Sequence, residues 1–264
     1  MLTRLQRVVR FVVPLEPGFP RQAVRVNSFA GHPLMDGAGA YMELLIQVCG
    51  EPDPETGYLR SITVLDEAAW GAGIPLLVSA IHAAPGRPLA SHLPALHAAL
   101  AALLDTAPTR VELRPSPLLS VSYEPHMPSA ARIAQRFEFS ASHRLHVPDR
   151  SDEENRRLFG KCNRPSGHGH NYGLEVEVEV PLAGEGRPGA QESLALVVRE
   201  HVVERFDHRH LNVDCPEFRS RNPSVENIAA VSWELLAGPL AAAGLPLRRV
   251  RVTETEKTWA EVTG

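Results

Sequence analysis

The stretch YGLEVEVEV, residues 172–180, decides the fold class, because polar and apolar side chains alternate along it. A period of two is typical of a β-strand whose two faces meet different surroundings. The three valines share one face of this strand and the three glutamates share the other. We therefore expect a sheet that covers an apolar core on one side and carries charges on the other.

A similar pattern lies earlier in the chain. YMELLIQV, from Tyr41, echoes the stretch from Tyr172, and RFVV at 10–13 echoes RFEF at 136–139. Each half continues with an apolar-periodic helix and two alternating stretches. In the first half these are LPALHAALAALL (93–104), TRVELRP and LLSVSYE. In the second half they are VENIAAVSWELL (225–236), RRVRVTE and TWAEV. The order strand, strand, helix, helix, strand, strand thus occurs twice, with LDEAAWGAG as the weakest helix. This predicts a tandem duplication, with units 1–127 and 128–264 joined near 124–131.

Such units place helices on one face of an antiparallel sheet, so the predicted fold class is α+β. Sheets of this kind have open edges that pair with another copy, and we expect a homo-oligomer.

Composition narrows the function. The chain of 264 residues has 27 basic and 31 acidic side chains and no basic run, which argues against a nucleic-acid partner. No stretch has the uninterrupted apolar length of a membrane span, and MLTRLQRVVRFVV at the N-terminus alternates like a strand and lacks the layout of a signal peptide. Three widely spaced cysteines, Cys49, Cys162 and Cys215, indicate reduced thiols and a cytoplasmic protein.

Two histidines begin the strand of the second half. His168 and His170 are two residues apart, so both side chains point to one face of an extended strand. In the preceding strand, FEFSASHRL, His143 shares its parity with Phe139 and lies on the apolar side. Neighbouring strands can therefore bring three imidazoles together, which is the pattern of a catalytic zinc site with one open position. The alternative is a set of exposed or capping histidines.

Cys162 lies just before this histidine pair, in GKCNRPSGHGHNY (160–172). It could close the zinc site as a fourth ligand, act as a thiolate base or nucleophile, or be an ordinary loop residue. Asp207 and His208 are adjacent in ERFDHRHLNVD, and a carboxylate beside an imidazole favours proton transfer. A Cys-His-Asp hydrolase built from these residues is one alternative function.

Two further stretches carry polar groups suited to a small ring. Glu254 and Thr255 lie in the alternating stretch RVRVTETEKTW, where a buried carboxylate can accept two parallel hydrogen bonds from an amino-pyrimidinone. NPSVENIA (222–229) predicts a helix start with Ser224 as its N-cap, followed by Glu226. The free N–H groups at such a start suit a ring carbonyl or an anion.

The second half resembles the 6-pyruvoyl-tetrahydropterin synthase family, which includes the 6-carboxy-tetrahydropterin synthases. The matching stretches are FEFSASHRL, FGKCNRPSGHGHNY, FDHRHLNVD, NPSVENIA and VTET, in the family's order over roughly residues 131–264. The resemblance implies a T-fold, in which rings of subunits form a barrel, with a trimer of two-unit chains as one such arrangement. It implies a zinc cofactor held by His143, His168 and His170, a catalytic set of Cys162, Asp207 and His208, and a pterin site at Glu254, Thr255, Ser224 and Glu226.

The resemblance also implies a substrate, 7,8-dihydroneopterin triphosphate. One branch of the family forms 6-pyruvoyl-tetrahydropterin with release of triphosphate, and the other forms 6-carboxy-tetrahydropterin on the way to queuosine. GKCNRPSGHGHNY is closer to the pyruvoyl-forming version, whereas the Ala-, Arg- and Pro-rich composition indicates a bacterial source, where the carboxy-forming activity is commoner.

The first half has no histidine pair before Tyr41 and no Asp-His pair after its first helix, and His32 is its one histidine near that position. It is therefore interpreted as a degenerate, structural copy. A pterin-binding or structural zinc protein without turnover is the second alternative function.

Overall fold

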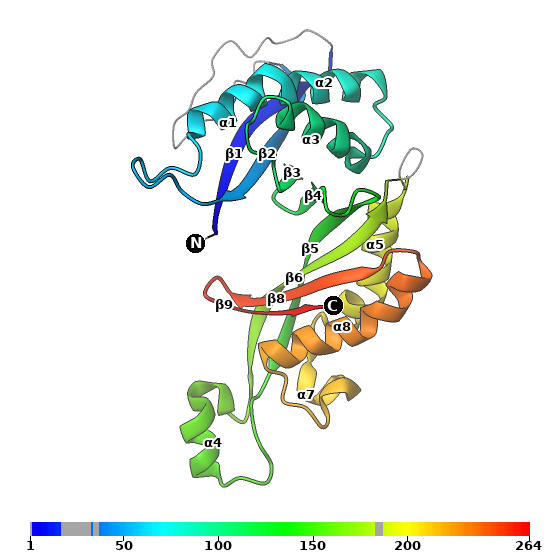
Figure 1. The fold of residues 1–264 in the computed structure, drawn as a ribbon. Helices are drawn as coiled ribbons and strands as arrows, with labels where there is room; N and C mark the ends of the chain where they lie inside the picture. The colour runs from blue at the N-terminus through cyan, green and yellow to red at the C-terminus, as the bar shows by residue number, and fades with distance from the viewer. Residues whose placement is uncertain (1, 17–32, 34–36, 183–186) are drawn as a thin grey trace. The chain divides into compact units, whose positions relative to one another are not determined.

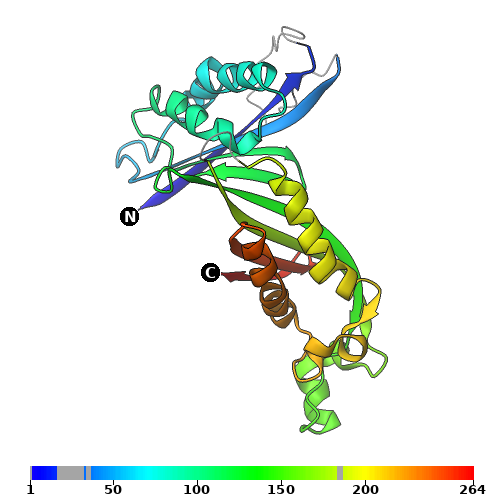
Figure 2. The same ribbon diagram turned by 90° about the vertical axis from the view of Figure 1, so that its right-hand side faces the viewer.

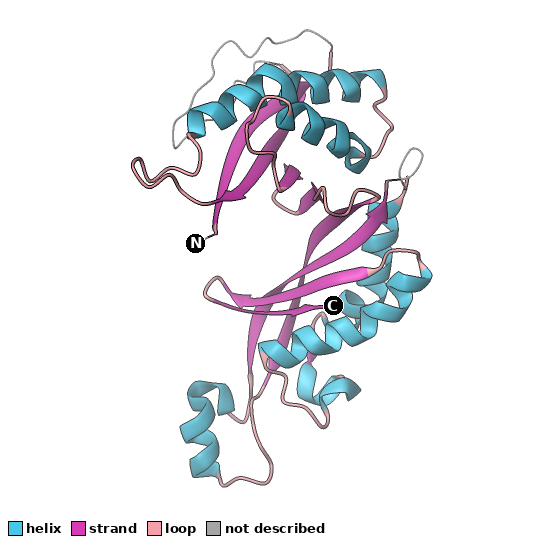
Figure 3. Cartoon of the chain, in the orientation of Figure 1, coloured by secondary structure: helices cyan, strands magenta, loops and turns pink. Residues whose placement is uncertain are grey.

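A computed structural model describes residues 2–16, 33, 37–182 and 187–264 of the chain. The chain divides into two compact units, Met1–Ile133 with Val180–Pro188, and Ala134–Glu179 with Gly189–Gly264. Both units combine antiparallel strands with helices, so the predicted α+β class is confirmed (Figure 1, Figure 3). His32 lies outside the described residues.

The first unit is a four-strand antiparallel arrangement with helices packed on it. Its strands follow one another in the order β1 (Thr3–Pro14), β2 (Gly39–Gly50), β3 (Arg110–Ser116) and β4 (Leu119–Tyr123). Its helices are α1 (Ile62–Ala68), α2 (Ile74–Ala83) and α3 (Leu93–Ala101). The apolar residues of the alternating strands form the core with these helices, and Phe11, Leu44 and Leu113 are fully buried.

The first helical region is longer than the sequence indicated. A short π-helical turn (Ala69–Gly73) joins α1 to α2, so the weak helix predicted at LDEAAWGAG is part of a helical run from Ile62 to Ala83. This 22-residue run is long and apolar enough to cross a membrane, which corrects the statement that no stretch has that length. The core helix of a globular unit meets the same criterion, and this run buries Leu65 and Leu77.

The second unit also has two long strands, then helices, then two strands, with a helix between its first two strands and a short extra strand among its helices. Its strands are arranged as β5 (Ala130–His143), β6 (His168–Pro181), β8 (Leu247–Thr255) and β9 (Thr258–Thr263), and β7 (Arg209–His210) runs parallel beside β5. Its helices are α4 (Asp152–Phe159), α5 (Ala190–Val198), α6 (Glu204–Phe206), α7 (Leu211–Asp214) and α8 (Val225–Ala242). Helix α8 packs on β8 and β9, and Figure 2 shows α5 and α8 along the strands of this unit.

Helix α8 begins where the sequence predicted. Ser224 has an extended backbone, and its side chain accepts a hydrogen bond from the Asn227 N–H, which confirms it as the N-cap. The helix buries Ile228 and Leu236 against the sheet. Because the N-cap fixes the first turn, it also fixes the segment before it, which includes Pro223.

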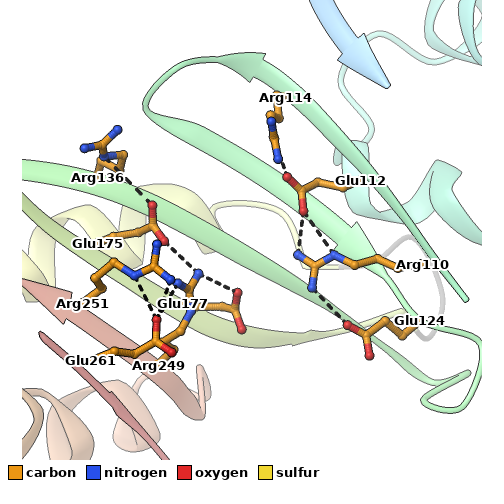
Figure 4. A network of polar contacts seen from close by, with 10 residues as sticks. All are labelled: Arg110, Glu112, Arg114, Glu124, Arg136, Glu175, Glu177, Arg249, Arg251 and Glu261. Carbon is orange, nitrogen blue, oxygen red and sulfur yellow. Dashed lines mark hydrogen bonds and ion pairs between the residues drawn. The ribbon is translucent and has the colours of Figure 1, made fainter. Parts of the chain in front are cut away.

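The polar face of the second unit's sheet is paired rather than simply solvated. Arg249 lies 2.8 Å from Glu175 and 3.2 Å from both Glu177 and Glu261, as Figure 4 shows. Glu177 is only 5% exposed, and a counter-charge so close lowers the cost of burying its carboxylate. The alternation of glutamates along β6 therefore marks a ladder of ion pairs.

A similar cluster lies on the first unit. Arg110 bridges two carboxylates, at 2.6 Å from Glu112 and 3.0 Å from Glu124, and Arg114 binds the other oxygen of Glu112 at 2.6 Å (Figure 4). Glu112 is 6% exposed. Both units thus balance a buried glutamate with arginines, which lie on the same strand as Glu112 in the first unit and on the neighbouring strand in the second.

Candidate metal centre

The end of β5 and the start of β6 bring three imidazoles together. One ring nitrogen from each of His143, His168 and His170 lies within 4.8 Å of the other two, and the Nε2 atoms of His143 and His168 are 3.2 Å apart. The predicted meeting of these side chains is confirmed. Among the described residues, this is the one group of three or more metal-ligating side chains so close together.

The tautomer of His143 is set by its surroundings. Its Nδ1 lies 2.6 Å from the carbonyl oxygen of Pro223, which can only accept a hydrogen bond, so Nδ1 carries the proton. The Nε2 lone pair therefore points toward the other two imidazoles. A backbone carbonyl that holds one nitrogen while the other faces a metal is the usual way in which a ligand histidine is oriented.

The three-histidine group fits a metal ion such as zinc. The Nε2 atom of His170 is buried and has no hydrogen-bond partner among the described residues, which is costly unless something binds it. Burial lowers the pKa values of both His143 and His168, and this keeps the rings neutral, as metal ligands must be. Three neutral imidazoles are a donor set that suits zinc.

Gly167 allows the chain to pass close to the end of β5, beside the metal centre. It has a φ of 68°, and a Cβ at this position would lie 2.8 Å from the carbonyl oxygen of His143 and 3.0 Å from Nε2 of His210. Only glycine satisfies both demands. The chain can thus turn into β6 directly beside the end of β5.

The segment that leaves β5 is held by asparagine side chains instead of a partner strand. Asn212 accepts a hydrogen bond from the Arg144 N–H at 2.8 Å and donates one to the Arg144 carbonyl at 2.9 Å. The next three residues are held in the same way: Asn163 donates to Leu145, Asn222 accepts from His146, and Asn155 bonds both backbone groups of Val147. The role of these asparagines was not predicted from the sequence, because their spacing follows no helical or strand period.

Cys162 lies in a short 3₁₀ turn, Gly160–Asn163, that follows α4. It is half-buried, and it is not part of the three-histidine group. Its carbonyl accepts a hydrogen bond from the Leu145 N–H, which ties the turn to the segment after β5. Helix α4 was not predicted, because its charged residues lack a helical apolar stripe. Ser151 and Glu154 form a capping box at its start.

Asp207 and His208 form the predicted pair. Nδ1 of His208 lies 2.8 Å from Asp207, whose other oxygen accepts a hydrogen bond from the Ser140 N–H. The Ser140 bond and then the His208 bond hold the pKa of Asp207 below its usual range. No hydrogen bond or ion pair among the described residues joins either side chain to Cys162, so the structure does not assemble the three in one chain.

His208 has an unusual backbone. Its φ is 56°, the one positive φ among the described non-glycine residues, and its side chain is 83% exposed. A left-handed conformation costs an ordinary residue about 1–2 kcal/mol, and such strain gathers at functional positions.

The predicted pterin-site residues differ in their surroundings. Glu254 faces the metal centre, with its carboxylate 3.5 Å from Nε2 of His143 and 3.6 Å from Nε2 of His170. Thr255 is exposed, and its hydroxyl accepts the Lys257 N–H in the β8–β9 turn. Glu226 is exposed, and a hydrogen bond from Ser224 lowers the pKa of its carboxyl.

Tyr172 lies beneath the same centre. It is fully buried, it stacks on Phe139 with ring centroids 5.1 Å apart, and its ring lies 5.5 Å from that of His170. Burial raises the pKa of its phenol well above the usual range, and the hydroxyl has no hydrogen-bond partner among the described residues. The ring therefore supports the histidines mainly by packing.

The fold and the site together define an α+β protein with a three-histidine metal centre in its second unit. Residues 132–264 match the profile of the family described as 6-pyruvoyl tetrahydropterin synthase. The chain belongs to this family, as its motifs predicted.

Individual relatives agree with the match. Over 131 residues, the chain is 39% identical to the 6-pyruvoyl tetrahydrobiopterin synthase of Homo sapiens. The matched region covers 48% of this chain and 86% of the relative. It is 37% identical over 102 residues to a protein of Archaeoglobus fulgidus, provisionally described as a 6-carboxy-5,6,7,8-tetrahydropterin synthase, over 39% of this chain and 78% of the relative. The solved 6-pyruvoyl tetrahydropterin synthase of Caenorhabditis elegans is 30% identical and covers 51% of this chain and 96% of its own, with a TM-score of 0.43.

Proposed function

We propose that the chain is a zinc-dependent lyase that acts on 7,8-dihydroneopterin triphosphate. The product is 6-pyruvoyl-tetrahydropterin, with release of triphosphate, or 6-carboxy-5,6,7,8-tetrahydropterin. The observation that carries the proposal is the group of three imidazoles, one of which has a buried nitrogen without a hydrogen-bond partner in the part of the chain that the structure describes. Membership of the pterin synthase family supplies the substrate class.

His143, His168 and His170 hold the zinc ion. Bound there, zinc would polarise the side-chain hydroxyls of the substrate and lower their pKa. The protein's part is to keep the ligands neutral and fixed, which the Pro223 carbonyl does for His143. The carboxylate of Glu254 lies beside His143 and His170, where it would anchor the amino-pyrimidinone ring of a pterin bound at the metal.

Proton transfer falls to Cys162, Asp207 and His208. Asp207 orients the imidazole of His208 through Nδ1 and leaves Nε2 free to exchange a proton. Because His208 is exposed and no hydrogen bond or ion pair among the described residues joins it to Cys162, we place this pair where a second copy of the chain completes the site. Ser224 and Glu226 supply the helix start that faces the pterin, and Thr255 supports Glu254.

The unit assigned to residues 1–127 serves as a structural copy within a ring-forming homo-oligomer in the cytoplasm. Its described residues contain no three-residue metal group. It would fill positions in the T-fold barrel next to the catalytic unit, 128–264.

The test is turnover of 7,8-dihydroneopterin triphosphate by zinc-loaded protein, with products identified by mass spectrometry. We expect one zinc per chain and one of the two pterin products. His168→Ala should lose the zinc and the activity, whereas His126→Ala, an exposed histidine of the first unit, should lose neither. Zinc binding without turnover would leave a pterin-binding or structural zinc protein and overturn the proposal.

A second pair of variants separates the lyase from a cysteine hydrolase. Cys162→Ala should abolish pterin turnover with zinc still bound, while Cys49→Ala, also half-buried, should leave turnover unchanged. Ester or amide hydrolysis that needs Cys162 and persists after zinc removal would favour the hydrolase.

A further inference from the structure

A cleft of about 610 Å³ opens beside the metal centre. Its volume falls within the range of about 300–1,000 Å³ typical of small-molecule sites. Three arginines line it, Arg144, Arg219 and Arg221, against one carboxylate, Asp149. The sequence analysis assigned no role to any of these residues.

None of the three histidines lines the cleft, but residues next to the metal centre along the chain do. Arg144 directly follows His143, and Asn222 directly precedes Pro223, the residue whose carbonyl holds His143. His210, on another wall, lies next to Gly167, where the chain turns into His168. The segments that carry the metal ligands thus also carry residues that line the cleft.

Its cationic groups are only partly neutralised. Arg144 donates through Nε to the Asn163 carbonyl, which leaves its terminal nitrogens free of any described bond. Arg219 is exposed, and its guanidinium has no hydrogen bond or ion pair with a described residue. Arg221 pairs with Glu234 at 2.8 Å, but both side chains are about half exposed, at 42% and 55%, so the pair is weak and can be exchanged.

Other polar groups face the same space. His210 lines the cleft and has a buried Nδ1 without a partner among the described residues, and His146 and Ser220 add further polar atoms. The wall from Arg144 to Val147 is held by asparagines, so the cleft does not have to form on binding. Guanidinium groups around a hollow with one preformed wall suit a multiply charged phosphate chain.

We propose that this cleft binds the polyphosphate chain of the substrate while the metal centre holds the pterin side chain. This assignment rests on the proposed function for its substrate, but its chemistry, recognition of a chain of phosphates, stands on the cleft alone. Three guanidinium groups match an anion with several negative charges far better than they match a single carboxylate.

The test is calorimetric binding of inorganic tripolyphosphate to the full-length, zinc-loaded protein. In the double variant Arg219→Gln/Arg221→Gln we expect the Kd to rise at least about tenfold, since each charge-assisted contact accounts for about a factor of ten. The matched control is Arg156→Gln/Arg157→Gln, which removes the same charge from exposed positions of α4 outside the cleft and should leave the Kd unchanged. Unaltered binding in the cleft variant, or equal weakening in both variants, overturns the proposal.

A kinetic comparison ties the cleft to the substrate. The cleft variant should raise KM for 7,8-dihydroneopterin triphosphate about tenfold and leave unchanged the inhibition constant of unphosphorylated 7,8-dihydroneopterin, which has no triphosphate to release and is used as a competitive inhibitor. Equal changes in the two constants would overturn the assignment to the phosphate chain. If the wild type does not turn over the triphosphate, the proposed function fails, while the tripolyphosphate titration still decides whether the cleft binds polyphosphate.

Discussion

The imidazole of His143 donates a hydrogen bond to the carbonyl of Pro223 across 2.6 Å, and this contact joins the end of β5 to the start of α8. The two residues are 80 positions apart in the sequence. One contact thus sets the tautomer of a metal ligand and fixes the segment that precedes the N-cap Ser224. The metal centre is organised by the packing of α8, before any ion binds.

The first prediction concerns this tautomer. In zinc-loaded protein labelled with ¹⁵N, the His143 ring should show a protonated Nδ1 and a metal-bound Nε2, because the Pro223 carbonyl can only accept. Long-range ¹H–¹⁵N correlation spectra distinguish the two nitrogens. A His143 signal with zinc on Nδ1 would contradict the structure.

The second prediction concerns Asn155, which is fully buried between α4 and the segment after β5. Its side chain bonds the N–H and the carbonyl of Val147 at 2.8 and 2.9 Å, and it also bonds the Arg150 carbonyl at 3.0 Å. Asn155→Ala leaves these groups without partners, so we expect the free energy of unfolding to fall by about 2–4 kcal/mol. Urea unfolding measures this change, and the control Asn171→Ala, at an exposed position, should cost less than about 1 kcal/mol. Equal losses would contradict the role of Asn155.

The asparagines show what the sequence could and could not predict. The strands and α8 followed from periodicity, because alternating and helical patterns report which face of an element is buried. The three histidines followed from the same parity, His143 with Phe139 and His168 with His170. The segment after β5 has no period, and its partners lie up to 76 residues away, as in the bond from His146 to Asn222.

Two local features depend on more than the local pattern of the sequence. Glu177 looked like a solvated side chain, and it is buried because Arg249 on β8 lies across from it, which depends on strand register. The resemblance predicts that Cys162 acts together with His208, and this stays a prediction, because nothing in the chain's local pattern sets the distance between a 3₁₀ turn and the residues after α6.

The third prediction concerns Arg249. Replacing it by leucine removes the counter-charge that lies 3.2 Å from the buried Glu177, so we expect a loss of about 2–4 kcal/mol in the free energy of unfolding. The double variant Arg249→Leu/Glu177→Leu should recover part of that loss, because no buried charge remains. Arg150→Leu, which breaks an exposed pair with Glu154, should cost less than about 0.5 kcal/mol. If the double variant is less stable than Arg249→Leu alone, the pairing argument is wrong.

The fourth prediction concerns Cys215. Burial raises the pKa of its thiol to about 11, and the side chain is 1% exposed. The thiolate reacts and the thiol does not, so a maleimide or disulfide probe at pH 8 should label Cys215 only after unfolding. Because the folded pKa is above the unfolded one, the stability that the protonated thiol contributes should be lost as the pH rises toward 11. Mass spectrometry of labelled peptides measures how fast each cysteine is labelled, with half-buried Cys49 as the comparison. Labelling of Cys215 as fast as Cys49 in folded protein would contradict its burial.

The fifth prediction uses the strained backbone of His208, whose φ is 56°. Glycine adopts this conformation without steric cost, whereas alanine does not. We therefore expect His208→Gly to be about 0.5–1 kcal/mol more stable than His208→Ala in urea unfolding. Both variants lose the imidazole that Asp207 orients, so the difference between them isolates the backbone. If the proposed relay is correct, both should also lose pterin turnover. Backbone strain that lowers stability at a residue needed for activity is typical of a functional position. Equal stability of the two variants would show that the backbone strain is absent in solution.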